Sequence, residues 1–252
     1  MEKYFNINES GASIHCKLCA KDVNDVQTVV LYGNGFGSDR DNRSAVRFAK
    51  HVLEKNRGVA VMTFNWPCHG NDVRKTLRLS DCDLYLSAIL SWIGARYPGA
   101  ALFGYAASFG GYLFLKYVSE HGDPFKKVAL RCPAVVLYDV FTRSIMTETE
   151  LARIGKGKPV SVGFDRKVAI DRTFLDSVKE ADISQRDFLP YADELFIVHG
   201  TEDEIVPFDA VKAFAENNVI EFTPVEHTDH RFQSPEKMDR AIAEICAFFG
   251  LK

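Results

Sequence analysis

The chain has 252 residues, 46% of them hydrophobic, and a formal net charge of −3. This length suits one large domain with a sizeable core, and the near-neutral charge offers no electrostatic footprint for nucleic acid. No apolar run approaches the length of a membrane span, and the start Met1–Asn6 lacks the pattern of a signal peptide. We therefore expect a cytoplasmic protein whose cysteines are reduced.

Strand-like and helix-like segments alternate along the chain. A pair of antiparallel strands is expected over Tyr4–Ala20. Further strands are expected at 28–32, 59–64, 100–103, 127–130, 195–198 and 219–223. Helices are expected at 45–53, 85–93, 112–118, from about 207, and from about 235 with Ser234 as N-cap. This alternation predicts an α/β fold with a mostly parallel, twisted sheet and helices on both faces.

The interval from about 133 to 190 interrupts this rhythm. It contains glycines, charged stretches and isolated aromatic residues, and it is longer than one crossover helix requires. We interpret it as a small cap inserted within the single domain 1–252; two ordinary surface helices with loops are the alternative. The aromatic residues of this interval predict either an apolar acyl pocket or simply the core of the cap: Tyr138, Phe141, Phe164 and Phe174.

Ser108 lies on a predicted sharp turn between a buried strand and a buried helix. Small residues stand two positions before it and two after it, at Ala106 and Gly110. This is the nucleophile-elbow pattern, in which a strained turn exposes the serine oxygen at the carboxyl edge of a sheet. Alanine replaces the usual glycine at 106 but is small enough for the turn. A serine of this kind needs a base and an orienting acid.

Candidates for both follow in the order serine, acid, histidine. An acidic turn with Asp203 comes after the strand that ends in His199-Gly200, and His227 and His230 come after the next strand. Each candidate therefore follows a predicted strand, where open parallel sheets place their ligand sites. Glu202, Glu204 and Asp139 are alternative acids, and His227 is an alternative base.

Five segments together resemble the α/β-hydrolases, in the esterase/lipase and serine-aminopeptidase-like group that includes cinnamoyl (feruloyl) esterases. They occur in that family's order over nearly the whole chain: Asn34-Gly35-Phe36-Gly37, Cys68-His69-Gly70, Ala106–Gly111, His199-Gly200-x-x-Asp203 and Asp229-His230-Arg231-Phe232. The resemblance implies Ser108 as nucleophile, Asp203 as acid and His230 as base.

The resemblance also implies an oxyanion hole made of two backbone amides. One belongs to Phe109, after the nucleophile, and the other to Phe36, in the loop after the first buried strand. The histidine that usually precedes the glycine of this loop is replaced by Asn34, and an alignment shifted by two residues makes Asn34 the donor instead. In the loop Asn65–Gly70, Asn65 and Cys68 depart from the family pattern, and His69 is expected to be structural.

Other chemistries have weaker support in the sequence. Cys16 and Cys19 have no second pair to complete a zinc site, and His227, Asp229 and His230 are three loop residues expected to point in different directions. Cys68 and Cys132 fall near predicted strand ends and are candidate pocket residues without a nucleophile motif. The glycines at 33, 35 and 37 lack the spacing of a nucleotide fingerprint. We therefore expect no metal and no cofactor.

The sequence thus predicts a serine hydrolase that cleaves a carboxylic ester, such as a hydroxycinnamoyl or other small acyl ester, through an acyl-enzyme. Thioester and amide substrates use the same machinery, so a thioesterase or an aminopeptidase remains open. A non-catalytic binding protein, or a haloperoxidase or lyase on the same scaffold, are more distant alternatives. The expected partner is a small-molecule acyl substrate, and a homodimer is compatible with the sequence.

Overall fold

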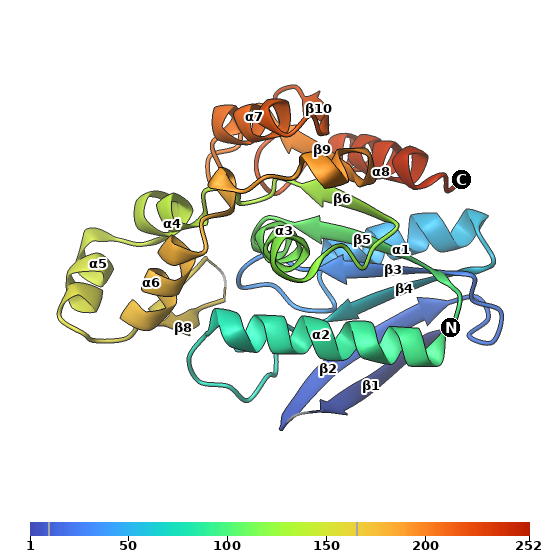
Figure 1. Cartoon of the computed structure of the whole chain (residues 1–252), viewed down its shortest axis with the longest axis horizontal. Helices are drawn as coiled ribbons and strands as arrows, with labels where there is room; N and C mark the ends of the chain where they lie inside the picture. The colour runs from blue at the N-terminus through green and yellow to red at the C-terminus, as the bar shows by residue number, and fades with distance from the viewer. Residues whose placement is uncertain (10, 165) are drawn as a thin grey trace.

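The computed structural model describes residues 1–9, 11–164 and 166–252. Among them, eight strands form one main sheet (Figure 1). Its strands are β1 (Glu2–Glu9), β2 (Ala12–Ala20), β3 (Thr28–Gly33), β4 (Val59–Phe64), β5 (Ala101–Ala107), β6 (Lys127–Arg131), β9 (Leu195–Gly200) and β10 (Glu221–Val225). The order across the sheet is β1-β2-β4-β3-β5-β6-β9-β10.

The strands from β4 to β10 in this order pair in parallel, whereas β2 pairs antiparallel with both β1 and β4. The inner parallel strands β4, β3, β5, β6 and β9 are mostly apolar because both faces of the sheet are covered there, whereas the edge strand β10 is partly exposed. Val30 and Tyr32 of β3, for example, point to one face, and Val29 and Leu31 point to the other. This confirms the mostly parallel sheet predicted from the sequence.

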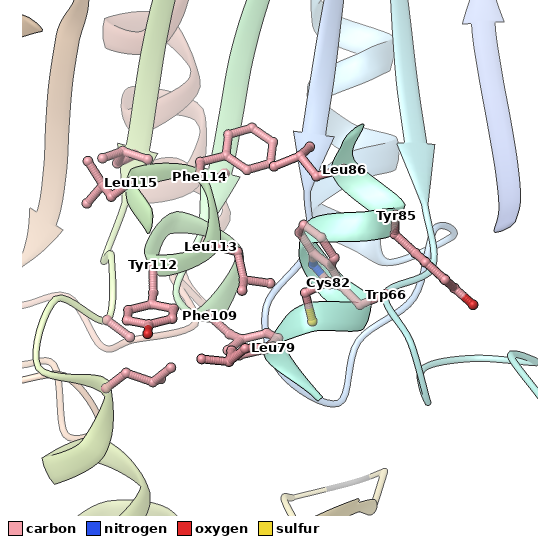
Figure 2. Packing of buried hydrophobic residues seen from close by; sticks show 14 of the residues in the cluster. Trp66, Leu79, Cys82, Tyr85, Leu86, Phe109, Tyr112, Leu113, Phe114 and Leu115 are labelled. Atoms are coloured by element: carbon pink, nitrogen blue, oxygen red, sulfur yellow. The ribbon is translucent and has the colours of Figure 1, made fainter. Parts of the chain in front are cut away.

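Two layers of helices cover the sheet. Helices α1 (Arg43–Lys55) and α8 (Pro235–Phe249) pack on one face. Helices α2 (Leu79–Arg96), α3 (Phe109–His121) and α7 (Phe208–Asn217) pack on the other. Figure 2 shows α2 and α3 side by side, with Leu86 and Phe114 between them. The sheet therefore lies inside the molecule, between two layers of helices.

The predicted elements fall close to the observed ones, with differences at their ends. Strand β5 runs on to Ala107, directly before Ser108. Helix α1 extends two residues beyond the expected range at each end, and the Asn56 backbone and side-chain amides cap it by donating to the Val52 carbonyl. Strand β10 begins at Glu221, two residues later than expected, because Val219 has a positive φ of 55°.

Between β6 and β9 the chain makes a long excursion. It contains α4 (Leu137–Asp139), the π-helix η1 (Val140–Ile145), α5 (Glu148–Gly155), a small hairpin β7 (Val160–Val162) and β8 (Val168–Ile170), α6 (Arg172–Glu180), and the 3₁₀-helices η2 (Ile183–Gln185) and η3 (Leu189–Glu194). In Figure 1 the helices α4, α5 and α6 lie beyond the arrowheads of the parallel strands. The excursion therefore lies at the carboxyl edge of the sheet.

Within the described ranges, no helix is both long enough and apolar enough to cross a membrane.

Candidate active site

Ser108 occupies the turn between β5 and α3 with a left-handed backbone, φ 53° and ψ −116°. Such a conformation is strained for a residue with a side chain and persists only where the surroundings fix it. Here the Ser108 amide donates to the Arg131 carbonyl on the neighbouring strand at 3.0 Å. Gly110 lies so close to the backbone of Gly33 and Asn34 that a side chain at 110 would collide with them.

The structure brings Ser108, His230 and Asp203 into one chain of hydrogen bonds. The His230 Nε2 lies 2.9 Å from the Ser108 Oγ, and its Nδ1 lies 2.7 Å from the Asp203 Oδ2. A neutral imidazole protonated on Nδ1 donates to the carboxylate and accepts from the serine hydroxyl. The Asp203 side chain is fully buried, whereas 12% of the His230 side chain is exposed. The histidine therefore lies between a buried acid and a partly open serine.

Asp203 is held by its own turn. Its Oδ1 accepts the backbone amides of Ile205 at 2.9 Å and Val206 at 2.7 Å. Its Oδ2 faces two imidazoles, those of His199 and His230. Burial opposes the negative charge, but the hydrogen bonds from the two histidines hold the pKa of Asp203 far below its usual range. The carboxylate therefore stays ionised at neutral pH and fixes the orientation of His230.

The loop that carries His230 is strained and tightly anchored. His227 and Phe232 both have positive φ, 51° and 54°. The Glu202 amide donates to the Thr228 carbonyl at 3.0 Å, and Gly200 lies so close to Thr228 that a side chain at 200 would collide with it. The end of β9 and the loop that carries His230 therefore pack backbone against backbone, which brings Asp203 within reach of His230.

The alternative acids and the alternative base lie elsewhere. Glu202 and Glu204 are exposed. The His227 Nδ1 pairs with Glu202 at 2.7 Å, and the two side chains are 79% and 63% exposed. The Glu204 carboxylate accepts the His230 backbone amide at 3.2 Å, so it contacts the loop and not the imidazole. Asp139, on α4, pairs with Arg143 at 3.5 Å.

Phe36 and Phe109 lie together beside Ser108. Their rings meet edge to face, with centroids 5.6 Å apart. The His69 ring stacks on Phe109 at 6.1 Å and meets Phe36 edge-on at 5.5 Å. Phe109 belongs to the buried packing of Figure 2. Within the described ranges the Phe36 amide donates to no acceptor, and the Phe109 amide is in the first turn of α3, where helix amides lack intrahelical partners.

His69 is a buried, neutral histidine. Its Nδ1 lies 2.8 Å from the Pro67 carbonyl, and burial lowers its pKa to about 4. Asn34 is tied into the same loop region: its Nδ2 donates to the Phe64 carbonyl at 2.5 Å, and its own carbonyl accepts the Trp66 indole at 2.9 Å. Gly35 follows, and a Cβ there would lie 3.5 Å from the Ser108 Cβ. The loop therefore turns toward Ser108 directly before Phe36.

Cys132, which the sequence offered as a candidate pocket residue, lies beside the acid, as does a second histidine that the sequence did not place here. The Cys132 sulfur, an Asp203 oxygen and a His230 nitrogen lie within 4.8 Å of one another, the one such group of potential metal ligands in the described ranges. Two of the three already bond to each other, so an ion would have to break that contact. Burial and the nearby Asp203 charge raise the pKa of the Cys132 thiol, which therefore stays protonated.

His199 is this second histidine. It is fully buried, and its Nε2 lies 3.2 Å from the Asp203 Oδ2 and 3.1 Å from the Val206 carbonyl. Both neighbours are acceptors, so Nε2 carries the proton. The only signal in the sequence was its place in the His-Gly pair ahead of Asp203. A histidine at the end of a buried strand gave no indication that it would point at the acid.

A pocket of about 260 Å³ separates the excursion from the start of α7. It is lined by Val136, Asp139, Val140, Arg143, Ser144, Pro207 and Ala210. Pro207 directly follows Val206, whose amide donates to Asp203. Two aromatic residues of the excursion also contact loops near Ser108. The Phe141 ring meets the Phe36 ring at a centroid distance of 4.9 Å, and the Arg231 guanidinium lies over the Phe164 ring at 5.1 Å.

Solved structures with the same fold include several hydrolases. Est1E from Butyrivibrio proteoclasticus, solved with ferulic acid, has a TM-score of 0.75 at 16% identity, covering 98% of this chain and 99% of its own. A soluble variant of monoglyceride lipase from Saccharomyces cerevisiae, in complex with a substrate analogue, has a TM-score of 0.75 at 14% sequence identity, covering 99% of this chain and 94% of its own. An esterase from Pyrococcus furiosus has a TM-score of 0.70 at 17% sequence identity, covering 99% of this chain and 92% of its own.

These likenesses establish the α/β-hydrolase fold that the sequence predicted. A comparison with curated protein sequences gave no match. The family model of the prolyl oligopeptidases matches residues 99–251, which is more than half of the chain and includes the serine turn, the acid turn and the histidine loop. The chain belongs to the prolyl oligopeptidase family.

Proposed function

We propose that the protein is a serine hydrolase that cleaves a carboxylic ester through an acyl-enzyme. The observation that carries this proposal is the continuous hydrogen-bonded chain from the Ser108 hydroxyl through His230 to Asp203, with distances of 2.9 and 2.7 Å. Serine is a weak nucleophile at neutral pH and reacts when a base takes its proton during attack. The three residues have the contacts that this step requires.

In this mechanism the Ser108 Oγ attacks the acyl carbonyl while its proton passes to the His230 Nε2. Asp203, ionised and buried, stabilises the imidazolium that forms. The carbonyl oxygen becomes an oxyanion, for which we propose the backbone amides of Phe36 and Phe109 as donors. The packing of the two phenyl rings and the approach of Gly35 to Ser108 support Phe36 over Asn34.

Collapse of this intermediate breaks the bond to the leaving alcohol, which takes the proton from His230. Water then attacks the acyl-Ser108 ester, with His230 again as base, and releases the carboxylic acid. We propose that residues 133–190 act as a cap that shapes the acyl pocket. The contacts of Phe141 with Phe36 and of Phe164 with Arg231 support this role. Est1E, whose structure holds ferulic acid, suggests hydroxycinnamoyl esters as the first acyl group to test.

Peptide or aminoacyl amides are the second candidate substrates, because the family match is to prolyl oligopeptidases. The proposed oxyanion donors and the hydrogen-bonded residues Ser108, His230 and Asp203 can act on an amide as well as on an ester. The leaving group then is an amine, which needs the proton from His230 more than an alcohol does.

The test is a fluorophosphonate probe followed by a substrate panel. We expect covalent labelling of the wild type and none of Ser108→Ala, whose kcat should fall by roughly 10⁶. Circular dichroism checks that the variant is folded. Esters of p-nitrophenol, methyl hydroxycinnamates, acyl-CoA and aminoacyl anilides then rank the leaving groups. Labelling that persists in Ser108→Ala would refute the nucleophile, and faster turnover of the anilides would favour the peptidase.

A further inference from the structure

We propose that Arg131 is a positioning residue that holds the His230 loop in line with Ser108. The inference rests on the proposed function and concerns a residue other than Ser108, His230 and Asp203. Arg131 is the last residue of β6, and its side chain lies on the α1 and α8 face of the sheet, beside Tyr32, Tyr105 and Phe232.

The Arg131 guanidinium makes two contacts with the histidine loop. Its Nη1 donates to the His230 carbonyl at 3.0 Å. Its central carbon lies 5.2 Å from the centre of the Phe232 ring, within the range of a cation–π contact. These contacts hold the residue that carries the imidazole and the strained residue two positions later. Within the described ranges, no other β6 side chain forms a hydrogen bond with this loop.

The same residue also holds the serine turn. The Arg131 carbonyl accepts the Ser108 amide at 3.0 Å, and Ser108 has the strained backbone of the turn. Arg131 therefore contacts the backbones of both Ser108 and His230, the first through its own carbonyl and the second through its side chain. A shift of the guanidinium moves the imidazole relative to the serine oxygen.

The placement of this charge is unusual for a residue with a purely structural role. Arg131 is only 7% exposed, and no described residue forms an ion pair with it. Burial opposes the charge, but a guanidinium is not deprotonated in proteins, so Arg131 remains a cation. Burial also raises the pKa of both tyrosines, so their hydroxyls are neutral. An unpaired buried cation is costly, whereas an apolar side chain would fill the same space without that cost.

The experiment compares two Arg131 variants with a matched control. Arg131→Met keeps the volume but removes both contacts, and Arg131→Lys keeps the charge without the planar guanidinium. Lys116→Met is the control, because Lys116 is also a buried cation (5% exposed) and pairs with Asp83 and Glu120 on α2 and α3. All three are expected to lower the melting temperature.

For Arg131→Met we expect kcat on an activated ester to fall about 10- to 100-fold with KM nearly unchanged, as for a displacement of about 1 Å in a catalytic group. Arg131→Lys should recover part of this loss, and Lys116→Met should keep the wild-type kcat. A kcat for Arg131→Met that matches the Lys116→Met control would overturn the proposal. Phe232→Leu is the second variant if Arg131→Met does not fold, and it should lower kcat in the same direction.

A double-mutant cycle separates positioning from a general loss of structure. In a His230→Ala background, Arg131→Met should cost little further activity, because the group it positions is absent. An equal fold loss in both backgrounds would contradict the inference.

The far-downfield proton resonance of the imidazole bonded to Asp203, identified by its absence from His230→Ala, gives a readout without turnover. It should weaken in Arg131→Met and persist in Lys116→Met; an unchanged resonance overturns the inference. A wild type that neither hydrolyses esters nor reacts with the fluorophosphonate would refute the proposed function alone, because the resonance still reports the contact.

Discussion

The buried imidazole of His199 lies 3.2 Å from the carboxylate oxygen of Asp203. That oxygen is the one that also accepts the Nδ1 proton of His230, so it is shared between two histidines. The His199 Nδ1 is buried and has no partner in the described ranges. His199 therefore contributes one hydrogen bond to the acid and leaves its second nitrogen unsatisfied.

We predict that His199→Phe lowers both stability and turnover. The substitution removes a donor from a buried carboxylate, which costs about 1–3 kcal/mol of unfolding free energy. Asp203 is then held in place by one fewer contact, so it orients His230 less firmly, and kcat should fall roughly tenfold. Chemical denaturation and ester kinetics measure the two effects. An unchanged kcat would mean that the contact supports the fold alone.

The two loop histidines should differ strongly in effect. His230→Ala removes the base and is expected to lower kcat by roughly 10⁵ to 10⁶. His227→Ala removes an exposed contact with Glu202 and should change kcat less than twofold, since exposed pairs contribute about 0–1 kcal/mol. Steady-state kinetics on one activated ester compares the two. Equal losses, or a larger loss at His227, would overturn His230 as the base.

Phe164 is the residue of the proposed cap with which to test acyl specificity. It is 44% exposed and lies against Arg231, next to His230. Phe164→Ala should change the ranking of acyl substrates, since contacts of this size discriminate by about 1–3 kcal/mol. Phe174→Leu is the control, because Phe174 is fully buried against Phe141 and should mainly affect stability. A common factor for all substrates in Phe164→Ala would point to a purely structural role.

Asp123, after the end of α3, should make stability depend on pH. One of its oxygens accepts the Phe125 amide at 2.7 Å, and the other is buried without a partner in the described ranges. Burial, with a contribution from Glu194, raises its pKa from 3.8 to about 6. The folded state therefore binds this proton more tightly than the unfolded state. The ionised carboxylate lowers stability above pH 6, and stability returns as the pH falls from 6 to 4.

Asp123→Asn keeps the acceptor for Phe125 and removes the charge. We expect it to stabilise the protein at pH 7.5 on the order of 1 kcal/mol, with the difference vanishing near pH 4. Thermal melts at both pH values measure this. A variant that is less stable than the wild type at pH 7.5 would contradict the assignment of an unpaired buried carboxylate.

Local patterns in the sequence were sufficient for the architecture. The buried parallel strands are short continuous apolar runs, whereas apolar residues in the helices between them recur every three or four positions. The alternation of these two patterns indicates a parallel sheet covered on both faces. The serine turn was predictable because its close packing allows only small residues: Gly110 has no room for a side chain against Gly33. The order of Ser108, Asp203 and His230 then follows from the place of each after a strand.

The contacts across the sheet could not be predicted in this way, because they join residues far apart in the chain. Ser108 and His230 are separated by 122 positions and meet only when β5, β9 and β10 lie in register. The second contact of Asp203 to His199, and the approach of Cys132, depend on which way side chains point at the ends of neighbouring strands. The buried guanidinium of Arg131 reads in the sequence as an ordinary strand end. Only the packing of α8 and the histidine loop over β6 removes it from water and directs it to the His230 carbonyl.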